Sequence, residues 1–463
     1  MLIDFRVSNF RCIRDEQALS LVPSGQDPKL LGNLFVGQRA KTLKCAAVFG
    51  SNASGKTSLL DALYVFVRFV VSSATRMNVG DLIAGIEPFA LAALSRSAPS
   101  TFGLSVELEQ GSFRYRTEVT GQKVIAEQLE WQSHAPGAHW VKLIDRREGA
   151  CDLHEQMGDS ARRDAISKDT RDNGLILSRA AERNVEVVRP LFRWFQEIVF
   201  VGRGGMGPGQ QLRILSDAAE RAAIDVEFRS RLLRLMADAD TGISGLEAAA
   251  HTLGQDLNLA GTEEASAEIR TLVDELNKIV VRFQETAKEK IKLATSSHQF
   301  VTLHRDLDTG ETIRFNLSDE STGTQRFLAY VVLLVQACAS GHLIVCDELD
   351  ASLHPHLTRR VIQMVQASQF NQTGAQLVFT THDVTLMDQN LLRRDQVWLT
   401  EKTGDGCMQL YSLWDFENMP RSNTALAKNY LAGRFGAVPR FGPELADIPS
   451  DSEPTLVHRL EDI

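Results

Sequence analysis

The spacing of hydrophobic positions predicts an α/β protein from the first residues onward. Residues 2–9 alternate between apolar and polar side chains, which is the period of a half-buried strand. An apolar run at residues 42–49 is followed by a Gly- and Ser-rich segment and then by a helical pattern at residues 58–71. Strand, Gly-rich turn and helix in this order predict the start of an α/β unit with a parallel sheet.

In the middle of the chain, the spacing of hydrophobic residues changes first to that of strands and then to that of helices. Alternating segments at residues 102–108, 112–119 and 123–131 are separated by turns at Gln110-Gly111 and Gly121-Gln122, which predicts a β-meander. Residues 210–293 are rich in Ala, Leu, Glu, Arg and Lys at helical spacing, which predicts a helical insertion.

The C-terminal part returns to strands and buried helices. Apolar cores flanked by turn residues are typical of a parallel α/β sheet. The pattern predicts strands at residues 300–307, 311–317, 343–346 and 376–380, and helices at 324–339 and 356–370. We therefore divide the chain into an N-terminal lobe (1–205), a helical insertion (206–295), a C-terminal lobe (296–440) and a flexible tail (441–463).

Composition places the chain among soluble globular proteins. It has 463 residues, of which 43% are hydrophobic and 24% charged, and a net charge of -9. This charge argues against a surface that is basic throughout, although one local basic groove is enough for nucleic acid. No apolar run reaches the roughly 20 residues needed to cross a bilayer. The six cysteines form no CxxC pair, and a reducing cytoplasm is expected.

The first chemical motif is a phosphate-binding loop. Residues 50–57 match GxxxxGK[ST] between the predicted strand and helix; they are Gly50, Ser51, Asn52, Ala53, Ser54, Gly55, Lys56 and Thr57. The two glycines let the backbone approach phosphates, and the amide groups at the helix N-terminus bind the anion. Lys56 offsets phosphate charge and Thr57 can ligate Mg²⁺. ATP and Mg²⁺ are the expected cofactors.

The second motif is an apolar strand that ends in two acids. Asp347 and Glu348 follow residues 343–346, in the pattern of a Walker B motif. Asp347 is expected to hold Mg²⁺, and Glu348 to orient and deprotonate the attacking water. An apolar strand ending in a solvated acidic turn gives the same pattern, and the presence of the P-loop favours the catalytic interpretation.

Two weaker motifs flank this strand. Ser321, Thr322 and Gly323 precede the predicted helix 324–339, where a serine is a good N-cap. The same Ser-x-Gly at a helix N-terminus is also the pattern of an ABC signature loop, which binds the γ-phosphate of ATP held by a second subunit. His382 follows the strand 376–380, where a γ-phosphate contact is expected, and residues 351–355 occupy the place of a D-loop.

The order P-loop, signature, Asp-Glu, D-loop and histidine separates this chain from small GTPases and from ring-forming AAA+ proteins. Together with Asn9-Phe10-Arg11 and Asn173-Gly174-Leu175, it resembles the heads of SMC and recombination-repair ATPases. The resemblance is closest to the AAA-15/OLD-like ABC ATPases of bacterial defence operons, and extends to about residue 440. It implies an α/β, ABC-type (SMC-like) P-loop ATPase head with a β-meander and a helical insertion.

The resemblance also implies roles and partners. It adds Arg11 as a candidate phosphate ligand, and implies a homodimer or higher homo-oligomer with ATP between the P-loop of one subunit and Ser321 and Gly323 of the other. It implies a regulatory switch in anti-phage defence that controls a separate effector, a nuclease or toxin. The signature departs from that of transporters, and the Q-loop has only Gln110 and Gln128 as candidates.

A second function, from another class, is a DNA-maintenance ATPase that clamps DNA on closed heads. Arginines in and beside the insertion could form the groove that this requires, although a solvated helix face is the favoured explanation of them. They are Arg203, Arg213, Arg221, Arg229, Arg231 and Arg234. Salt-dependent retention of DNA distinguishes the two functions.

Overall fold

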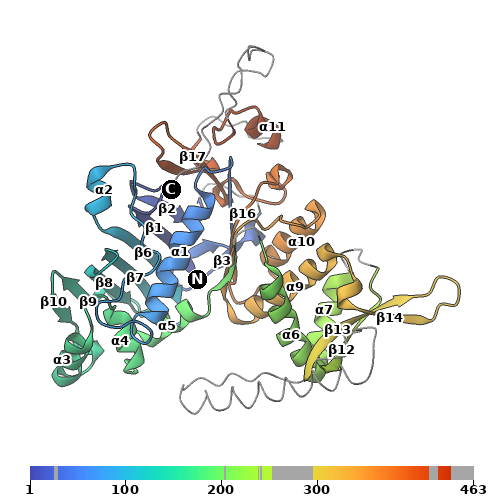
Figure 1. The fold of residues 1–463 in the computed structure, drawn as a ribbon, viewed down its shortest axis with the longest axis horizontal. Helices are drawn as coiled ribbons and strands as arrows, with labels where there is room; N and C mark the ends of the chain where they lie inside the picture. The colour runs from blue at the N-terminus through green and yellow to red at the C-terminus, as the bar shows by residue number, and fades with distance from the viewer. Residues whose placement is uncertain are drawn as a thin grey trace, which may run out of the picture.

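The computed structural model describes residues 1–24, 30–202, 205–237, 239, 242–252, 296–416 and 426–439. Within them the chain forms two large sheets, and helices lie between these sheets and beside them. A smaller unit consists of helices and one three-stranded sheet (Figure 1). The predicted α/β fold class with a β-meander is confirmed.

A six-stranded sheet contains the predicted parallel strands that flank the Gly-rich loop and the acidic motif. Its order is β11-β15-β16-β5-β17-β18, and every pair is parallel except β17 with β18. The strands β5, β15 and β16 are buried over their whole length, which explains their uninterrupted apolar sequences. The bounds are β5 Cys45–Gly50, β11 Val199–Val201, β15 Leu343–Cys346, β16 Gln376–Thr380, β17 Val397–Lys402 and β18 Met408–Ser412.

A seven-stranded antiparallel sheet contains the predicted meander. Its order is β10-β9-β8-β7-β6-β1-β2, so that the N-terminal strand lies directly beside the meander. One face packs on α1 (Lys56–Ser72), where the ring of Phe66 stacks on Phe102 and Tyr115. The bounds are β1 Leu2–Ser8, β2 Gln17–Ser20, β6 Ser100–Leu108, β7 Gly111–Val119, β8 Val124–Gln132, β9 Val141–Arg147 and β10 Ala150–Leu153.

The predicted helical insertion is helical only in part. Helices α6 (Pro208–Ile224) and α7 (Val226–Ala237) match the prediction, but β12 (Gly245–Thr252) is a strand that pairs with β13 (Ser296–Arg305). The helical prediction is therefore wrong for β12. Its three consecutive alanines favour helix, and pairing with β13 overrides that local preference. The rest of the predicted insertion, residues 253–295, lies outside the described residues, as does the predicted tail after residue 440.

The C-terminal lobe follows the predicted order of elements. Strand β14 (Thr312–Asn316) completes the small sheet β12-β13-β14, and α9 (Thr322–Ser340) and α10 (Pro355–Gln366) precede and follow the strand β15 with its acidic end. The remaining strands and helices are β3 Leu34–Val36, β4 Lys41–Leu43, α2 Ala93–Ser97, α3 Ser160–Asp169, α4 Ile176–Glu182, α5 Arg189–Gln196 and α11 Leu426–Leu431. Short 3-10 turns lie at Leu31–Asn33, Glu155–Met157, Leu317–Asp319, Val384–Leu386, Arg394–Gln396 and Leu413–Asp415.

No helix in the described part of the chain is long and apolar enough to span a membrane. All six cysteines lie within the described part of the chain, and each is a free thiol.

Candidate nucleotide and catalytic site

The P-loop connects β5 to α1 through two positions that only glycine fits. Gly50 (φ 156°) ends β5, and a Cβ there would lie 2.4 Å from Thr400 Oγ1. Gly55 (φ 112°) precedes the first residue of α1, and a Cβ there would lie 2.6 Å from Met408 Sδ. The loop therefore packs its backbone against β17 and β18, and the amide groups at the N-terminus of a 17-residue helix are available to an anion.

Lys56 lies beneath this loop rather than in solvent. Its ammonium group donates to the carbonyls of Gly50 (2.7 Å) and Ser51 (3.1 Å), and the residue is 6% exposed. Burial lowers the pKa of Lys56, while the nearby carboxylates of Asp347 and Glu348 act in the opposite direction. A cation is thus held at the base of the loop, close to the acids of the second motif.

Thr400 braces the P-loop from the neighbouring strand β17. Its hydroxyl lies 2.7 Å from Ser54 Oγ and also donates to the carbonyl of Phe49 (3.2 Å). Sequence analysis missed this residue. No motif marks a single threonine in a strand so distant in the sequence, and only the parallel pairing of β5 with β17 brings it to the loop.

The carboxylate of Asp347, at the end of β15, connects the P-loop helix α1 to the neighbouring strand β16. The hydroxyl of Thr57 donates to its carboxylate (3.1 Å to Oδ2), and the hydroxyl of Thr380 donates to Oδ1 (2.6 Å). Asp347 is 6% exposed. The structure therefore brings together the two residues predicted as metal ligands, at the carboxyl ends of β5, β15 and β16.

Glu348 has a backbone conformation that is rare for residues other than glycine. Its φ is 55°, and its N–H donates to Thr380 Oγ1 (2.7 Å). Such a conformation costs on the order of 1–3 kcal/mol and is often found at functional sites. Glu348 Oε1 lies 4.0 Å from His382 Nε2, and both side chains are about 40% exposed. The predicted acid and histidine therefore face one another at the solvent edge of the site.

Thr380 is the second residue that sequence analysis left without a role. Its one hydroxyl donates to Asp347 and accepts from the N–H of Glu348, so it fixes both acids relative to β16. The histidine turn is fixed separately, because the N–H of His382 donates to the carboxylate of Asp350 (3.3 Å). The only signal of Thr380 in the sequence is its place at the end of an apolar strand, two residues before His382.

Ser321 and Gly323 lie at the start of α9. The hydroxyl of Ser321 accepts from the N–H of Thr324 (3.1 Å), so the predicted N-cap is observed, and Gly323 lies in the first helical turn. These contacts stay within α9 and do not reach the P-loop of the same chain. Arg326, one turn later, donates to the carbonyl of Ala351 (2.7 Å), which links α9 to the predicted D-loop.

The side chain of Arg11 contacts carboxylates. Its guanidinium donates to Glu87 (2.8 Å) and forms an ion pair with Asp61 of α1. The next residue, Cys12, lies against Gly55, so the turn that bears Arg11 adjoins the P-loop. Of the two Q-loop candidates, Gln128 donates to Asp145 on the seven-stranded sheet, and Gln110 lies in the turn between β6 and β7.

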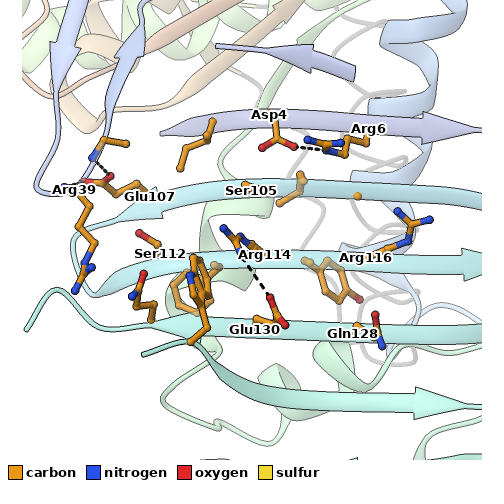
Figure 2. Close-up of a pocket in the computed structure, with 18 residues that line it drawn as sticks. Asp4, Arg6, Arg39, Ser105, Glu107, Ser112, Arg114, Arg116, Gln128 and Glu130 are labelled. Carbon is orange, nitrogen blue, oxygen red and sulfur yellow. Dashed lines mark hydrogen bonds and ion pairs between the residues drawn. The ribbon is translucent and has the colours of Figure 1, made fainter. Parts of the chain in front are cut away.

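A separate hollow of about 630 Å³ lies on the open face of the seven-stranded sheet. Figure 2 shows its arginine side chains beside acidic ones. Small residues, Gly103, Ser105 and Ser112, leave the space, and Arg6 pairs with Asp4 (3.0 Å). None of the predicted ATP or metal ligands lines this hollow.

The residues of the P-loop region fit Mg-ATP. Mg²⁺ in nucleotide sites usually takes one or two protein oxygens, with phosphates and waters completing its octahedron. The hydroxyl of Thr57 and the carboxylate of Asp347 form such a set. No group of three or more His, Cys, Asp or Glu side chains that could hold a metal occurs within the described residues. The close approach of backbone at Gly50 and Gly55, with a buried lysine behind it, suits a chain of phosphates.

Comparison with known proteins gives one family match. Residues 215–388 match a family described as "AAA domain, putative AbiEii toxin, Type IV TA system". The matched segment contains Ser321, Asp347, Glu348 and His382, and excludes the P-loop. The chain matches none of the curated proteins.

Several solved structures are similar over most of the chain. An SMC head domain from Thermotoga maritima is 12% identical, with 89% of this chain and 98% of that chain covered and a TM-score of 0.39. An SMC head bound to the C-winged helix domain of ScpA is 12% identical, with 89% and 97% covered and a TM-score of 0.38. The recombination mediator protein RecF-ATPrS is 12% identical, with 89% and 98% covered and a TM-score of 0.32.

Proposed function

We propose that this chain is an ABC-type ATPase that binds Mg-ATP at residues 50–57 and hydrolyses it at a site completed by a second copy. The observation that carries the proposal is one hydrogen-bonded series, Thr57 to Asp347 to Thr380 to Glu348. It connects the P-loop helix to both predicted acids at one edge of a parallel sheet. Phosphate binding and water activation require these groups at the same place.

Each residue has a distinct task in this proposal. The amides at the start of α1 and the ammonium of Lys56 bind the phosphates, and Lys56 exchanges its loop carbonyls for phosphate oxygens. Thr57 and Asp347 hold Mg²⁺, which neutralises phosphate charge when bound. Glu348 accepts a proton from water, since it is the more exposed of the two acids, and His382 lies beside it on the open side of the site.

Replacement of the buried lysine tests the nucleotide site. Lys56→Ala is expected to abolish ATP binding and turnover, because residues 50–57 contain no other cationic side chain. The matched control is Lys168→Ala, which removes an exposed lysine at the end of α3. ATP binding by calorimetry and phosphate release are measured for both. Near-normal turnover by Lys56→Ala contradicts the proposal.

We further propose that the ATPase acts as a switch for a separate effector, a nuclease or toxin, in bacterial defence against phage. The matched family description, which names a putative toxin and a type IV toxin–antitoxin system, supports this biological setting. Binding of a γ-phosphate between two copies is a two-state event that can hold or release a partner.

The test is a pull-down with tagged Glu348→Gln, which is expected to bind ATP without hydrolysing it. With ATP and Mg²⁺, a stoichiometric protein partner that is lost without ATP supports the switch. DNA alone, released as salt rises, supports DNA maintenance instead. Two of the six arginines considered for a DNA groove make contacts within the chain that favour the first outcome: Arg221 pairs with Asp225 (3.2 Å), and Arg231 stacks on Phe370.

A further inference from the structure

Glu320, the residue directly before Ser321, has a carboxylate held by two side chains of another element. Its Oε1 accepts from the hydroxyl of Thr302 (2.6 Å) and lies 2.7 Å from Nε2 of His304. Thr302 and His304 are two residues apart on β13, so both side chains project from the same face of that strand. The carboxylate is 13% exposed, and Thr302 is completely buried.

The same loop has a second attachment through Gln325. The amide of Gln325 donates to the backbone carbonyl of Glu320 (2.8 Å), and its carbonyl accepts from Gln211 of α6 (3.2 Å). Helix α6 packs in turn on β13. The loop before α9 is thus fixed from two directions, by the sheet β12-β13-β14 and by α6.

We propose that Glu320 is a positioning residue. It fixes the position of Ser321 and Gly323 relative to the ATP bound by the other copy, and Thr302 and His304 fix the position of the Glu320 carboxylate. This inference rests on the proposed ATPase function. It adds the element that controls the signature loop, namely the three-stranded sheet whose strands β12 and β13 flank residues 253–295.

The contacts give a physical reason for this role. Ser321 caps α9, and its side chain is exposed, so little besides its neighbours in the chain fixes where its hydroxyl lies. A carboxylate with two short hydrogen bonds is a strong local anchor because bonds to charged groups are stronger than neutral ones. A shift of β13 relative to α9 therefore moves Ser321 with Glu320, and displacement of a reacting group by about 1 Å can cost about 100-fold in rate.

The first test compares three variants. Glu320→Ala is expected to lower ATP turnover about 10- to 100-fold, with the Kd for ATP of the monomer unchanged. Glu320→Gln keeps an oxygen that accepts from Thr302 and is expected to retain most of the turnover. Glu311→Gln, which alters an exposed carboxylate in the hairpin between β13 and β14, is the matched control and is expected to match the wild type. Wild-type turnover by Glu320→Ala overturns the proposal.

A mixing experiment separates positioning from a general folding defect. Lys56→Ala is expected to be inactive alone and Glu320→Ala to keep about a tenth of the turnover or less, but a mixed dimer has one site with an intact P-loop and an intact signature loop. With random pairing and two equivalent sites, the mixture is expected to recover about a quarter of the wild-type turnover. If turnover does not recover although Glu320→Ala still binds ATP, the proposal is overturned, because the other copy then does not supply the function that Glu320→Ala lacks.

Dimerisation gives a readout that does not depend on turnover. In a Glu348→Gln background, ATP is expected to produce dimers that Glu320→Ala weakens and Glu320→Gln preserves, as measured by sedimentation. The double variant Thr302→Val, His304→Phe removes both partners of Glu320 and is expected to behave like Glu320→Ala; full dimerisation by it contradicts the assigned anchor. Normal turnover by Lys56→Ala alone would instead reject the underlying ATPase function.

Discussion

At the scale of single residues, the site depends on two threonines that have no motif of their own. Thr400 braces the P-loop through Ser54, and Thr380 connects the two acids. Motif spacing predicted Lys56, Thr57, Asp347 and Glu348 because the chemistry prescribes both the residue types and their local order. It could not predict Thr400, since that contact exists only once β17 pairs with β5.

Thr380→Val tests the contribution of one hydroxyl. The change preserves shape, leaves the N–H of Glu348 without its acceptor, and removes a 2.6 Å bond to Asp347. Hydrogen bonds to charged groups contribute about 1.5–3 kcal/mol, so kcat is expected to fall about 10- to 100-fold while ATP still binds. Single-turnover phosphate release measures the chemical step.

The control for this prediction is Thr358→Val in α10. Thr358 is also buried, but its hydroxyl has no hydrogen-bond partner in the structure. The same chemical change there is expected to leave kcat unaltered and the free energy of unfolding equal or slightly higher. Equal losses in both variants would show that Thr380 acts through general packing.

At the scale of elements, a buried carboxylate holds the segment that contains Asn173-Gly174-Leu175 to the meander. Glu127 of β8 accepts from the N–H groups of Ile176 (2.7 Å) and Leu177 (2.9 Å) and from the hydroxyl of Tyr115 (2.9 Å). Burial raises the pKa of Glu127, and these donors lower it in part. A sequence motif that looked like a family hallmark is therefore a structural junction that joins α4 to the sheet covering α1.

Glu127→Leu is expected to destabilise the protein strongly. It leaves two backbone donors, a phenol and the guanidinium of Arg146 buried without this acceptor. Loss of one partner from such a buried polar group costs about 3–5 kcal/mol, which thermal unfolding measures as a large fall in Tm.

Glu130→Leu, on the same strand, provides the comparison. Glu130 is 36% exposed and lies 3.9 Å from Arg114, and an exposed pair of this kind contributes about 0–1 kcal/mol. A similar fall in Tm for both variants would contradict the role assigned to Glu127.

The elements also show where sequence patterns stop being informative. Strands β15 and β16 were predicted to the residue, because each is an apolar run with a sharp chemical boundary. The single strand predicted at residues 42–49 covers part of β4 and most of β5. Strand β12 was predicted as helix, since Ala248, Ala249 and Ala250 prefer helix and its partner β13 begins more than 40 residues later. Strand formation there is decided by long-range pairing, which local periodicity does not contain.

At the scale of the whole molecule, the P-loop site and the start of α9 have separate hydrogen-bond groups within the chain. The P-loop, Asp347, Thr380 and Glu348 form one connected group within the chain, whereas the hydrogen bonds of Ser321 remain in the first turn of α9. The P-loop group is therefore connected within one chain, whereas the exposed N-terminus of α9 is not part of these hydrogen bonds. This division is the physical basis for proposing that two copies complete each site.

Ser321→Arg tests that division. The long cationic side chain is expected to leave ATP binding by the P-loop of its own chain unchanged within about twofold, since measured effects of distant surface changes are small. It is expected to abolish ATP-dependent dimers in the Glu348→Gln background, because the arginine occupies the space at the helix N-terminus that the second nucleotide needs. Ser97→Arg, which alters an exposed serine of α2, controls for added charge and bulk. Sedimentation with and without ATP measures the dimer fraction. Dimers that persist in Ser321→Arg would mean that closure does not use the start of α9, which would contradict the role proposed for Ser321.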